Sequence, residues 1–424
     1  MQYEWINNVA NMTPDYSIIT FHDKFNQNIK PNTLPENLTT LTFSRKFNQK
    51  IEPNTLPEKL TTLTFGRKFN QKIEPNTLPE NLTNLIFGYC FNQIIGLNTL
   101  PENIITLTFG CRFNQKIEPN ILPENLANLI FGRRFNQKIG PNILSKNLTT
   151  LIFGHCFNQK IEPNTLPKNL TTLAFGFWFN QKIELNTLPK NLTTLAFGFW
   201  FNQKIELNTL PKNLSTLTFG YRFDQKIELL PKNLTTLKFG SYFDQKIEPN
   251  ILPENLTTLT FGELFNQKIE PNTLLENISS LTFDYHFNQG IDPNTLPEKL
   301  TTVTFGLRFN QKIDSEMLPF NLKSINFNWI YCEKYDLSKY HIEMINNIPN
   351  YYHVKILVGR NIFDNNDLKW PIHVVDYEEC GENEWPSTIY EIQDKYIHPL
   401  YDSITILINK NTYQSYSSAK SAFK

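Results

Sequence analysis

The chain has 424 residues with 40 basic and 40 acidic side chains, so its formal net charge is zero. That balance argues against a strong overall attraction to nucleic acid or to an acidic membrane surface. Five cysteines, no apolar leader behind Met1 and no long apolar run indicate a protein of a reducing compartment without a membrane span. We therefore expect a cytoplasmic monomer.

A repeat of 22 residues fills most of the chain from Phe25 onward. Each of its 14 copies opens with Phe-Asn or Phe-Asp, and every step is 22 residues except the step from Phe223 to Phe243, which is 20. The missing pair is the Asn-Thr before a Leu, which indicates a surface turn that tolerates length change. A fixed period of this length is typical of a solenoid, in which units stack because none can bury a core alone.

Each repeat has a strand half. In residues 60–65, Leu63 and Phe65 alternate with threonines, which predicts a strand with one buried face. The pattern recurs from residues 16–21 to residues 322–327 and gives 15 strands. Because every strand follows the same circuit, neighbouring strands must pair in parallel.

The return half of each repeat carries prolines such as Pro75 and Pro79, which favour an extended or turn-like path over an α-helix. Without helices on the back, we expect shallow curvature, an arc of about 65 to 70 Å from steps of roughly 4.8 Å. The core is predicted from columns of constant character. These are an Ile column from Ile29 to Ile313, a Leu column from Leu34 to Leu318, and two Phe columns.

The Asn behind each repeat Phe forms a polar column that we expect inside the solenoid. It is Asn in 12 repeats and becomes Asp at Asp224 and Asp244. A stacked amide can hydrogen-bond the backbone of its own coil and of the next one, so a structural role is favoured over a ligand-binding role.

The unit Phe-Asn-Gln-x-Ile, followed by Leu-Pro-x-x-Leu-x-x-Leu-x-Phe-Gly, resembles the FNIP repeat, a leucine-rich-repeat-like unit found mainly in amoebae and their large DNA viruses. The resemblance covers roughly residues 16–327. It implies a leucine-rich-repeat-like solenoid, and host cytoplasm as the location if the protein is viral. Family members often carry an N-terminal F-box, but the 15 residues before the first strand are too few for one, so we expect none.

Only two adjacent positions of the repeat vary freely, the pair just before Phe-Asn. They lie past the end of each strand, so stacking should align them into a ridge rich in Arg, Tyr and Trp, which are typical of protein interfaces. The alternative is a core rim with drifting surface residues, since the identical repeats at 171–192 and 193–214 indicate recent duplication. The predicted partner-binding residues of this ridge are Arg45, Arg67, Arg112, Arg133, Arg134, Phe177, Trp178, Phe199, Trp200, Tyr221 and Tyr242.

Charged columns offer a second candidate surface. Lys and Glu flank the column Ile in nine repeats, as Lys72 and Glu74 do, and predict neutral ladders. Two residues past the column Leu, five successive repeats carry Lys in place of Glu, a stripe for an acidic partner. The column from Glu162 to Glu248 is expected to neutralise it. The stripe consists of Lys146, Lys168, Lys190, Lys212 and Lys232.

No catalytic, cofactor or metal site is predicted. Cys90 and Cys111 lie on adjacent repeats, but His155 and Cys156 lie two and three coils further on, about 10 to 14 Å away by coil spacing. Zinc ligands must converge within roughly 2.0–2.3 Å of one ion, so one shared site is excluded and free thiols are expected.

The predicted organisation is a short lead (1–15), a solenoid (16–327) and a C-terminal capping segment (328–424). In the last segment a helix is predicted at 337–346 and strands at 352–358 and 403–408. The favoured function is a non-enzymatic scaffold that binds a partner protein through the ridge and the adjoining strand face. The alternatives are a catalytic or separate binding module in residues 328–424, and RNA binding on the Arg and aromatic ridge, which zero net charge counts against.

Overall fold

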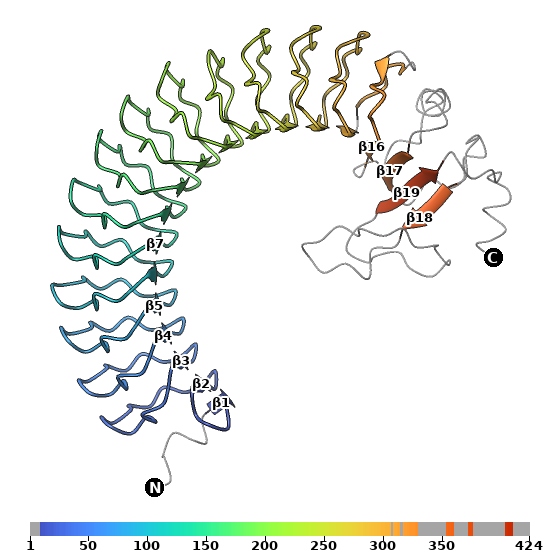
Figure 1. Ribbon diagram of the computed structural model, residues 1–424. Coiled ribbons are helices and arrows are strands. Elements are labelled where there is room, and N and C mark those ends of the chain that lie inside the picture. The colour runs from blue at the N-terminus through green and yellow to red at the C-terminus, as the bar shows by residue number, and fades with distance from the viewer. Residues whose placement is uncertain are drawn as a thin grey trace, which may run out of the picture. The chain divides into compact units, whose positions relative to one another are not determined.

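The computed structural model describes residues 9–306, 308–313, 317–329, 353–359, 372–375 and 403–409. They belong to two units, Met1–Gly220 and Tyr221–Lys424. In each unit, coils stack side by side with their strands along one side and their return halves along the other (Figure 1). The described part contains no α-helix, which confirms the prediction of a helix-free return half.

The first unit holds a ladder of parallel strands in constant register, with Leu41 opposite Leu63 and Leu63 opposite Leu85. Its strands are β2 (Ile18–Phe21), β3 (Thr40–Thr42), β4 (Thr62–Thr64), β5 (Asn84–Ile86), β6 (Thr106–Thr108), β7 (Asn128–Ile130), β8 (Thr150–Ile152), β9 (Thr172–Ala174), β10 (Thr194–Ala196) and β11 (Thr216–Thr218). One strand that the sequence did not indicate, β1 (Val9–Met12), pairs antiparallel with β2. It covers the N-terminal edge of the sheet, so the predicted lead forms part of the structure.

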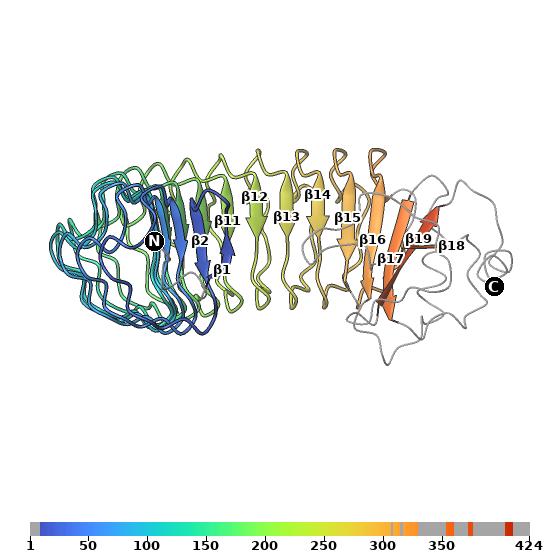
Figure 2. The same cartoon turned by 90° about the horizontal axis from the view of Figure 1, so that it is seen from below.

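The second unit continues the same pattern and then departs from it. Its strands are β12 (Thr236–Lys238), β13 (Thr258–Thr260), β14 (Ser280–Thr282), β15 (Thr302–Phe305), β16 (Ser324–Trp329), β17 (His353–Gly359), β18 (Ile372–Val375) and β19 (Ser403–Asn409). Strands β12 to β17 pair in parallel, whereas β19 pairs antiparallel with both β17 and β18. Figure 2 shows these strands side by side.

The predicted strands are thus confirmed at 15 repeat positions and at β17 and β19, while β18 was not predicted. The parallel strand β17 and then the antiparallel strands β19 and β18 extend the sheet beyond β16, and the capping role of this segment stays a prediction. The helix predicted at 337–346 lies outside the described residues. The domain limits 1–15, 16–327 and 328–424 stay a prediction.

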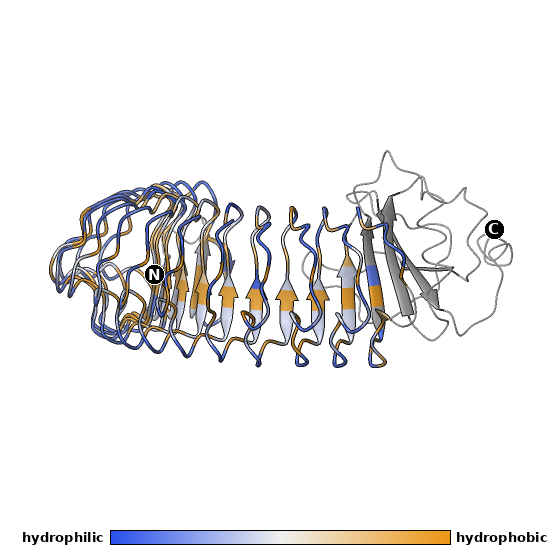
Figure 3. Ribbon diagram, turned by 90° about the horizontal axis from the view of Figure 1, so that it is seen from above, coloured by the Kyte–Doolittle hydropathy of each residue, from blue (hydrophilic) through white to orange (hydrophobic). Residues whose placement is uncertain are grey.

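The core consists of the predicted columns. Each three-residue strand buries its central residue and leaves the flanking residues half-exposed, or exposed at the end of β5 and β12, an alternation that Figure 3 shows as orange and near-white segments along the strands. The Ile, Leu and Phe columns are buried in every coil. The two Phe columns interleave: Phe65 and Phe69 stack at 3.9 Å within a coil, and Phe69 and Phe91 stack at 6.1 Å between coils.

These ring spacings show that the coils fan apart away from the strands. Parallel strands lie about 4.8 Å apart, whereas rings of the second Phe column, such as Phe113 and Phe135, lie 6.1 Å apart. The strand side of each unit is therefore the inside of the bend. The arc length predicted from the sequence assumes one step of roughly 4.8 Å for all parts of the coil, and so leaves out this divergence. The shallow curvature expected of the whole solenoid stays a prediction.

Two columns of small or polar residues shape the backbone turns. At Gly154 an added Cβ would lie 1.8 Å from the carbonyl oxygen of Gly132, so most coils have Gly here because neighbouring coils approach closely, although Ser44 and Asp284 occupy the same position in two coils. In the Pro-Asn turn the Asn has positive φ, 58° at Asn76 and 62° at Asn164, a conformation that Asn tolerates better than other side-chain-bearing residues.

Candidate partner-binding ridge

The ridge consists of the two residues that precede the repeat Phe in each coil, just past the carboxyl end of the strand. Backbone hydrogen bonds join its coils: the N–H of Lys68 donates to the carbonyl of Arg45 at 2.9 Å, and the N–H of Trp178 to the carbonyl of His155 at 2.9 Å. The close approach at the preceding Gly column makes this ladder possible. The ridge is therefore a continuous, hydrogen-bonded edge within the first unit, as the sequence predicts.

The first part of the ridge is cationic. Its basic side chains are all exposed, and none makes an ion pair with a described residue. Tyr89 lies between two of them, with the guanidinium carbon of Arg67 at 5.0 Å and that of Arg112 at 5.6 Å from its ring centroid. We call this part the cationic section: Arg45, Lys46, Arg67, Lys68, Arg112, Arg133 and Arg134.

The second part is a pair of aromatic stacks. Phe177 lies between His155 at 4.3 Å and Phe199 at 4.4 Å, with nearly parallel rings, and Trp178 stacks on Trp200 at 5.2 Å. Trp178 is 45% exposed, whereas the other four rings are half-buried by their neighbours. We call His155, Phe177, Trp178, Phe199 and Trp200 the aromatic section. Parallel stacking leaves mainly the ring edges for a partner.

The position of His155 lowers the pKa of its side chain. Its Nδ1 is buried and has no hydrogen-bond partner among the described residues. Burial first, and the positive charge of Arg133 second, lower the pKa of the imidazole. The neutral ring is therefore the form that stacks on Phe177, at the junction of the two sections.

In the second unit the ridge residues again pair cation with ring. Arg222 lies 4.3 Å from the ring centroid of Tyr242, and Tyr221 contacts the same ring at 5.2 Å. Arg308 lies 5.5 Å from the ring of Tyr285. Tyr221, Tyr242 and Tyr285 are half-buried, so these coils also present packed edges to solvent.

The Asn column next to the ridge holds the turn, as predicted. The Oδ1 of Asn48 accepts the backbone N–H of Asn70 at 2.8 Å, and that of Asn158 accepts the N–H of Asn180 at 2.9 Å. Asp224 takes the same role by accepting the N–H of Asp244 at 3.0 Å. The prediction that this column lies inside is wrong, because its residues are half-buried or exposed at the rim, where the backbone turns.

The lysine stripe lies before the strands, at the edge of the sheet opposite the ridge. In the first unit Lys146, Lys168, Lys190 and Lys212 are exposed and make no ion pair with a described residue, and in the second unit Lys232 is exposed. The expectation that the Glu column from Glu162 neutralises the stripe is wrong for the first unit.

The partners of that Glu column explain the difference. Glu184 binds Lys160 at 3.1 Å and Glu206 binds Lys182 at 3.5 Å, so the carboxylates point to the lysines of the return half. The predicted neutral ladder is confirmed by these pairs and by Lys72 with Glu74 at 2.9 Å.

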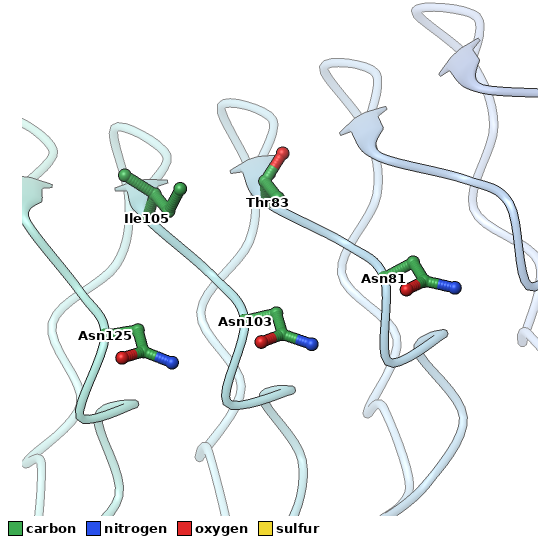
Figure 4. Close-up of a pocket in the computed structure, with 5 residues that line it drawn as sticks. All are labelled: Asn81, Thr83, Asn103, Ile105 and Asn125. Carbon is green, nitrogen blue, oxygen red and sulfur yellow. The ribbon is translucent and has the colours of Figure 1, made fainter.

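A shallow hollow of about 440 Å³, which was not predicted from the sequence, lies along the stripe side of the sheet. Asn81, Asn103 and Asn125 form one row and Thr83 and Ile105 a second row nearer the strands (Figure 4). The Nδ2 of Asn81 donates to the carbonyl of Glu58 at 2.8 Å, so these amides are used in joining coils. The recurring Asn before the strand Leu was the signal available in the sequence.

The described residues offer little else of chemical interest. Cys90, Cys111 and Cys156 are free thiols. Within the described ranges no group of three or more His, Cys, Asp or Glu side chains could hold a metal ion. The same ranges include no helix with the length and apolarity needed to cross a bilayer. Cys332 and Cys380 lie outside the described residues.

Three solved structures resemble the chain. The circular LRR protein CroV588, from a giant virus, is 41% identical with a TM-score of 0.69, and the match covers 82% of this chain and 54% of that one. TLR13, solved with ssRNA13, is 17% identical with a TM-score of 0.54 (74% and 50% covered), and YopM from Yersinia enterocolitica is 19% identical with a TM-score of 0.40 (73% and 77% covered). This chain thus spans about half the length of CroV588.

The comparison with families gives the identity of the repeat. Models of the FNIP Repeat match residues 25–68, 69–112, 113–156, 135–178, 157–200, 179–222, 201–229, 223–264 and 265–308. Comparison with curated proteins gives no match. Parallel coils, helix-free return halves and the matched repeats agree with a leucine-rich-repeat-like solenoid. The chain therefore belongs to the FNIP repeat family.

Proposed function

We propose that this protein is a non-enzymatic scaffold that binds a partner protein through the ridge and the adjoining strand face. The observation that carries the proposal is the gathering of Arg, Tyr and Trp side chains on one hydrogen-bonded edge, while the rest of each coil repeats nearly without change. These residue types dominate the binding energy of protein interfaces. A rigid edge also binds without a large cost in ordering.

The strand face next to the ridge suits the same role. Its half-exposed residues are mostly threonines, such as Thr62 and Thr64, and the hydroxyl of Thr61 donates to the carbonyl of Thr39 at 3.1 Å. Apart from the exposed Lys238 of β12, this strand face carries no charged side chain within the short repeat strands. Leucine-rich-repeat-like solenoids are typical scaffolds for protein interaction, which supports the proposal. We place the protein in the cytoplasm, of the host if it is viral, and expect a monomer.

The test is affinity capture from a host-cell lysate with the intact chain and two variants. The aromatic-section variant carries Phe177→Ala, Trp178→Ala, Phe199→Ala and Trp200→Ala. The control carries Leu185→Ala and Leu207→Ala, which remove side chains 57% and 56% exposed in the return halves of the same coils. Circular dichroism establishes that both variants are folded.

The proposal predicts that the intact chain and the control recover the same proteins and that the aromatic-section variant does not recover them. Equal recovery by all three would show that the aromatic section is not the binding site. Loss only after removal of residues 328–424 would transfer the site to that segment.

A further inference from the structure

The cationic section is an uncompensated row of charge. Its seven basic residues occupy four of five successive coils, and the remaining ridge residues of these coils, Tyr89, Cys90 and Cys111, are neither basic nor acidic residue types. The lysines of the return half behave differently, since Lys72, Lys116 and Lys160 each bind a Glu within 3.2 Å. Like charges about 5 Å apart repel one another unless a counter-charge is present.

None of the acidic residues of the same coils forms an ion pair with this row among the described residues. In the same coils the edge before the strands carries exposed glutamates such as Glu80 and Glu102, nine residues before Tyr89 and Cys111. These glutamates lie at the opposite end of each strand from the ridge, and carboxylates of the return half such as Glu52 and Glu74 bind return-half lysines instead. The zero net charge of the whole chain therefore does not describe the surface that a ligand meets here.

The rings of the ridge are poorly placed to bind nucleic-acid bases. Single-stranded nucleic acid is held largely by bases stacking on free aromatic faces. Tyr89, the aromatic residue of the cationic section, has Arg67 of the preceding coil and Arg112 of the following coil over its ring. Phe177 has a ring on each face, and Trp178 and Trp200 face each other. Carboxylates need no such faces, because guanidinium groups bind them through their edges.

The length of the row fits a short extended peptide. Four steps of about 4.8 Å from the coil of Arg45 to that of Arg133 give roughly 19 Å, the length of about six residues of extended chain. We propose that the cationic section binds an extended acidic segment of the partner protein, with Glu or Asp side chains against the Arg and Lys row. This inference rests on the proposed function, because it names the chemistry of the partner that the ridge binds.

The experiment measures fluorescence anisotropy with three labelled probes: a 12-residue peptide of alternating Glu and Ser, the same peptide with Lys for Glu, and a 12-nucleotide uridine RNA. The ridge variant carries Arg67→Glu and Arg133→Glu. The matched control carries Lys59→Glu and Lys138→Glu, which change the net charge equally at exposed residues outside both the ridge and the lysine stripe. All substituted side chains are exposed, so both variants should keep the fold.

We expect the acidic peptide to bind the intact chain, with an affinity that falls as salt rises, and the Lys peptide not to bind. The ridge variant should bind the acidic peptide at least about tenfold more weakly, and the control less than about threefold more weakly. Equal weakening in both variants would overturn the inference, because the peptide would then sense only net charge.

Two other outcomes also overturn it. Tighter binding of the uridine RNA, lost in the ridge variant, would assign the row to nucleic acid. If the acidic peptide does not bind the intact chain at low salt, the inference is wrong whatever the variants show. The proposed function fails separately: if capture still depends on Phe177, Trp178, Phe199 and Trp200, the scaffold function holds although the acidic-segment inference does not.

Discussion

At the scale of single residues, two columns of the repeat favour Gly or Asn because the local backbone geometry restricts which side chains fit. Gly154 and the other glycines of its column permit neighbouring coils to approach, and their φ angles are not positive. The Asn of each Pro-Asn turn has the opposite role, since its φ is positive while its space is open. A residue type that recurs at one repeat position can therefore reflect close approach of neighbouring coils in one column and a required backbone conformation in another.

Replacement of Gly154 by Ala tests the close approach. The new Cβ would lie 1.8 Å from a backbone oxygen, so we expect a loss of about 1–3 kcal/mol in the free energy of unfolding. Gly140→Ala is the control, because its Cβ would lie 3.6 Å from the nearest atom, an ordinary contact. Urea titration of both variants measures the difference. Equal stability of the two would contradict the role assigned to the column.

His155 provides a prediction for pH. Burial and Arg133 hold the pKa of His155 below its ordinary value of 6.5. As pH falls through 6.5 the unfolded chain therefore takes up a proton before the folded protein does, and the free energy of unfolding decreases. His155→Phe keeps a ring in the stack and removes this proton.

Thermal unfolding at about pH 7.5 and about pH 5.5 measures the effect. The variant should lose less stability between the two pH values than the natural chain. His286, whose pKa burial also lowers, is present in both proteins and contributes equally. An unchanged pH dependence in the variant would refute the assignment to His155.

At the scale of the coil, hydrogen bonds from one coil to the next replace the helix that other repeat proteins place on their back. Asn158 accepts the N–H of Asn180 at 2.9 Å and the side-chain amide of Gln181 at 3.0 Å. Because each coil contacts only its neighbours, such bonds contribute to the coil–coil interface energy together with the stacked Phe, Ile and Leu columns.

Asn158→Ala should therefore destabilise the protein by about 1–3 kcal/mol, because two donors lose their acceptor. Asn158→Asp is the matched control, since Asp224 and Asp244 accept the equivalent N–H groups in their coils. Chemical denaturation compares the two variants. If Asp is as damaging as Ala, acceptance of the N–H is not what the column provides.

At the scale of the molecule, the period explains what could be predicted. Ile73, Leu78 and Phe69 belong to columns that repeat without exception, so the core and the strand positions follow from the sequence. β1 and β18 lie outside the repeat and could not be inferred from it. The expectation that the Glu column neutralises the lysine stripe was wrong because spacing along the chain does not show that Glu184 and Glu206 point to return-half lysines.

The candidate site, too, could be predicted from the sequence only in part. Its position past the strand ends could be read from the two variable letters of the repeat. Its internal order could not, because the stacking of Phe177 between His155 and Phe199 depends on ring orientation. Nor does the sequence show that Arg67 and Arg112 lie over Tyr89, which leaves their charge without a carboxylate partner among the described residues.

The most direct test of the central claim, that the ridge binds a partner protein, is site-specific photo-crosslinking in host-cell lysate. A photoreactive benzoyl-phenylalanine replaces Phe177 or Phe199 on the ridge, and Leu185 or Leu207 in the return halves as controls. The account predicts one discrete crosslinked protein from both ridge positions and none from the controls. The same crosslinked protein from the return-half positions, with none from the ridge, would contradict it.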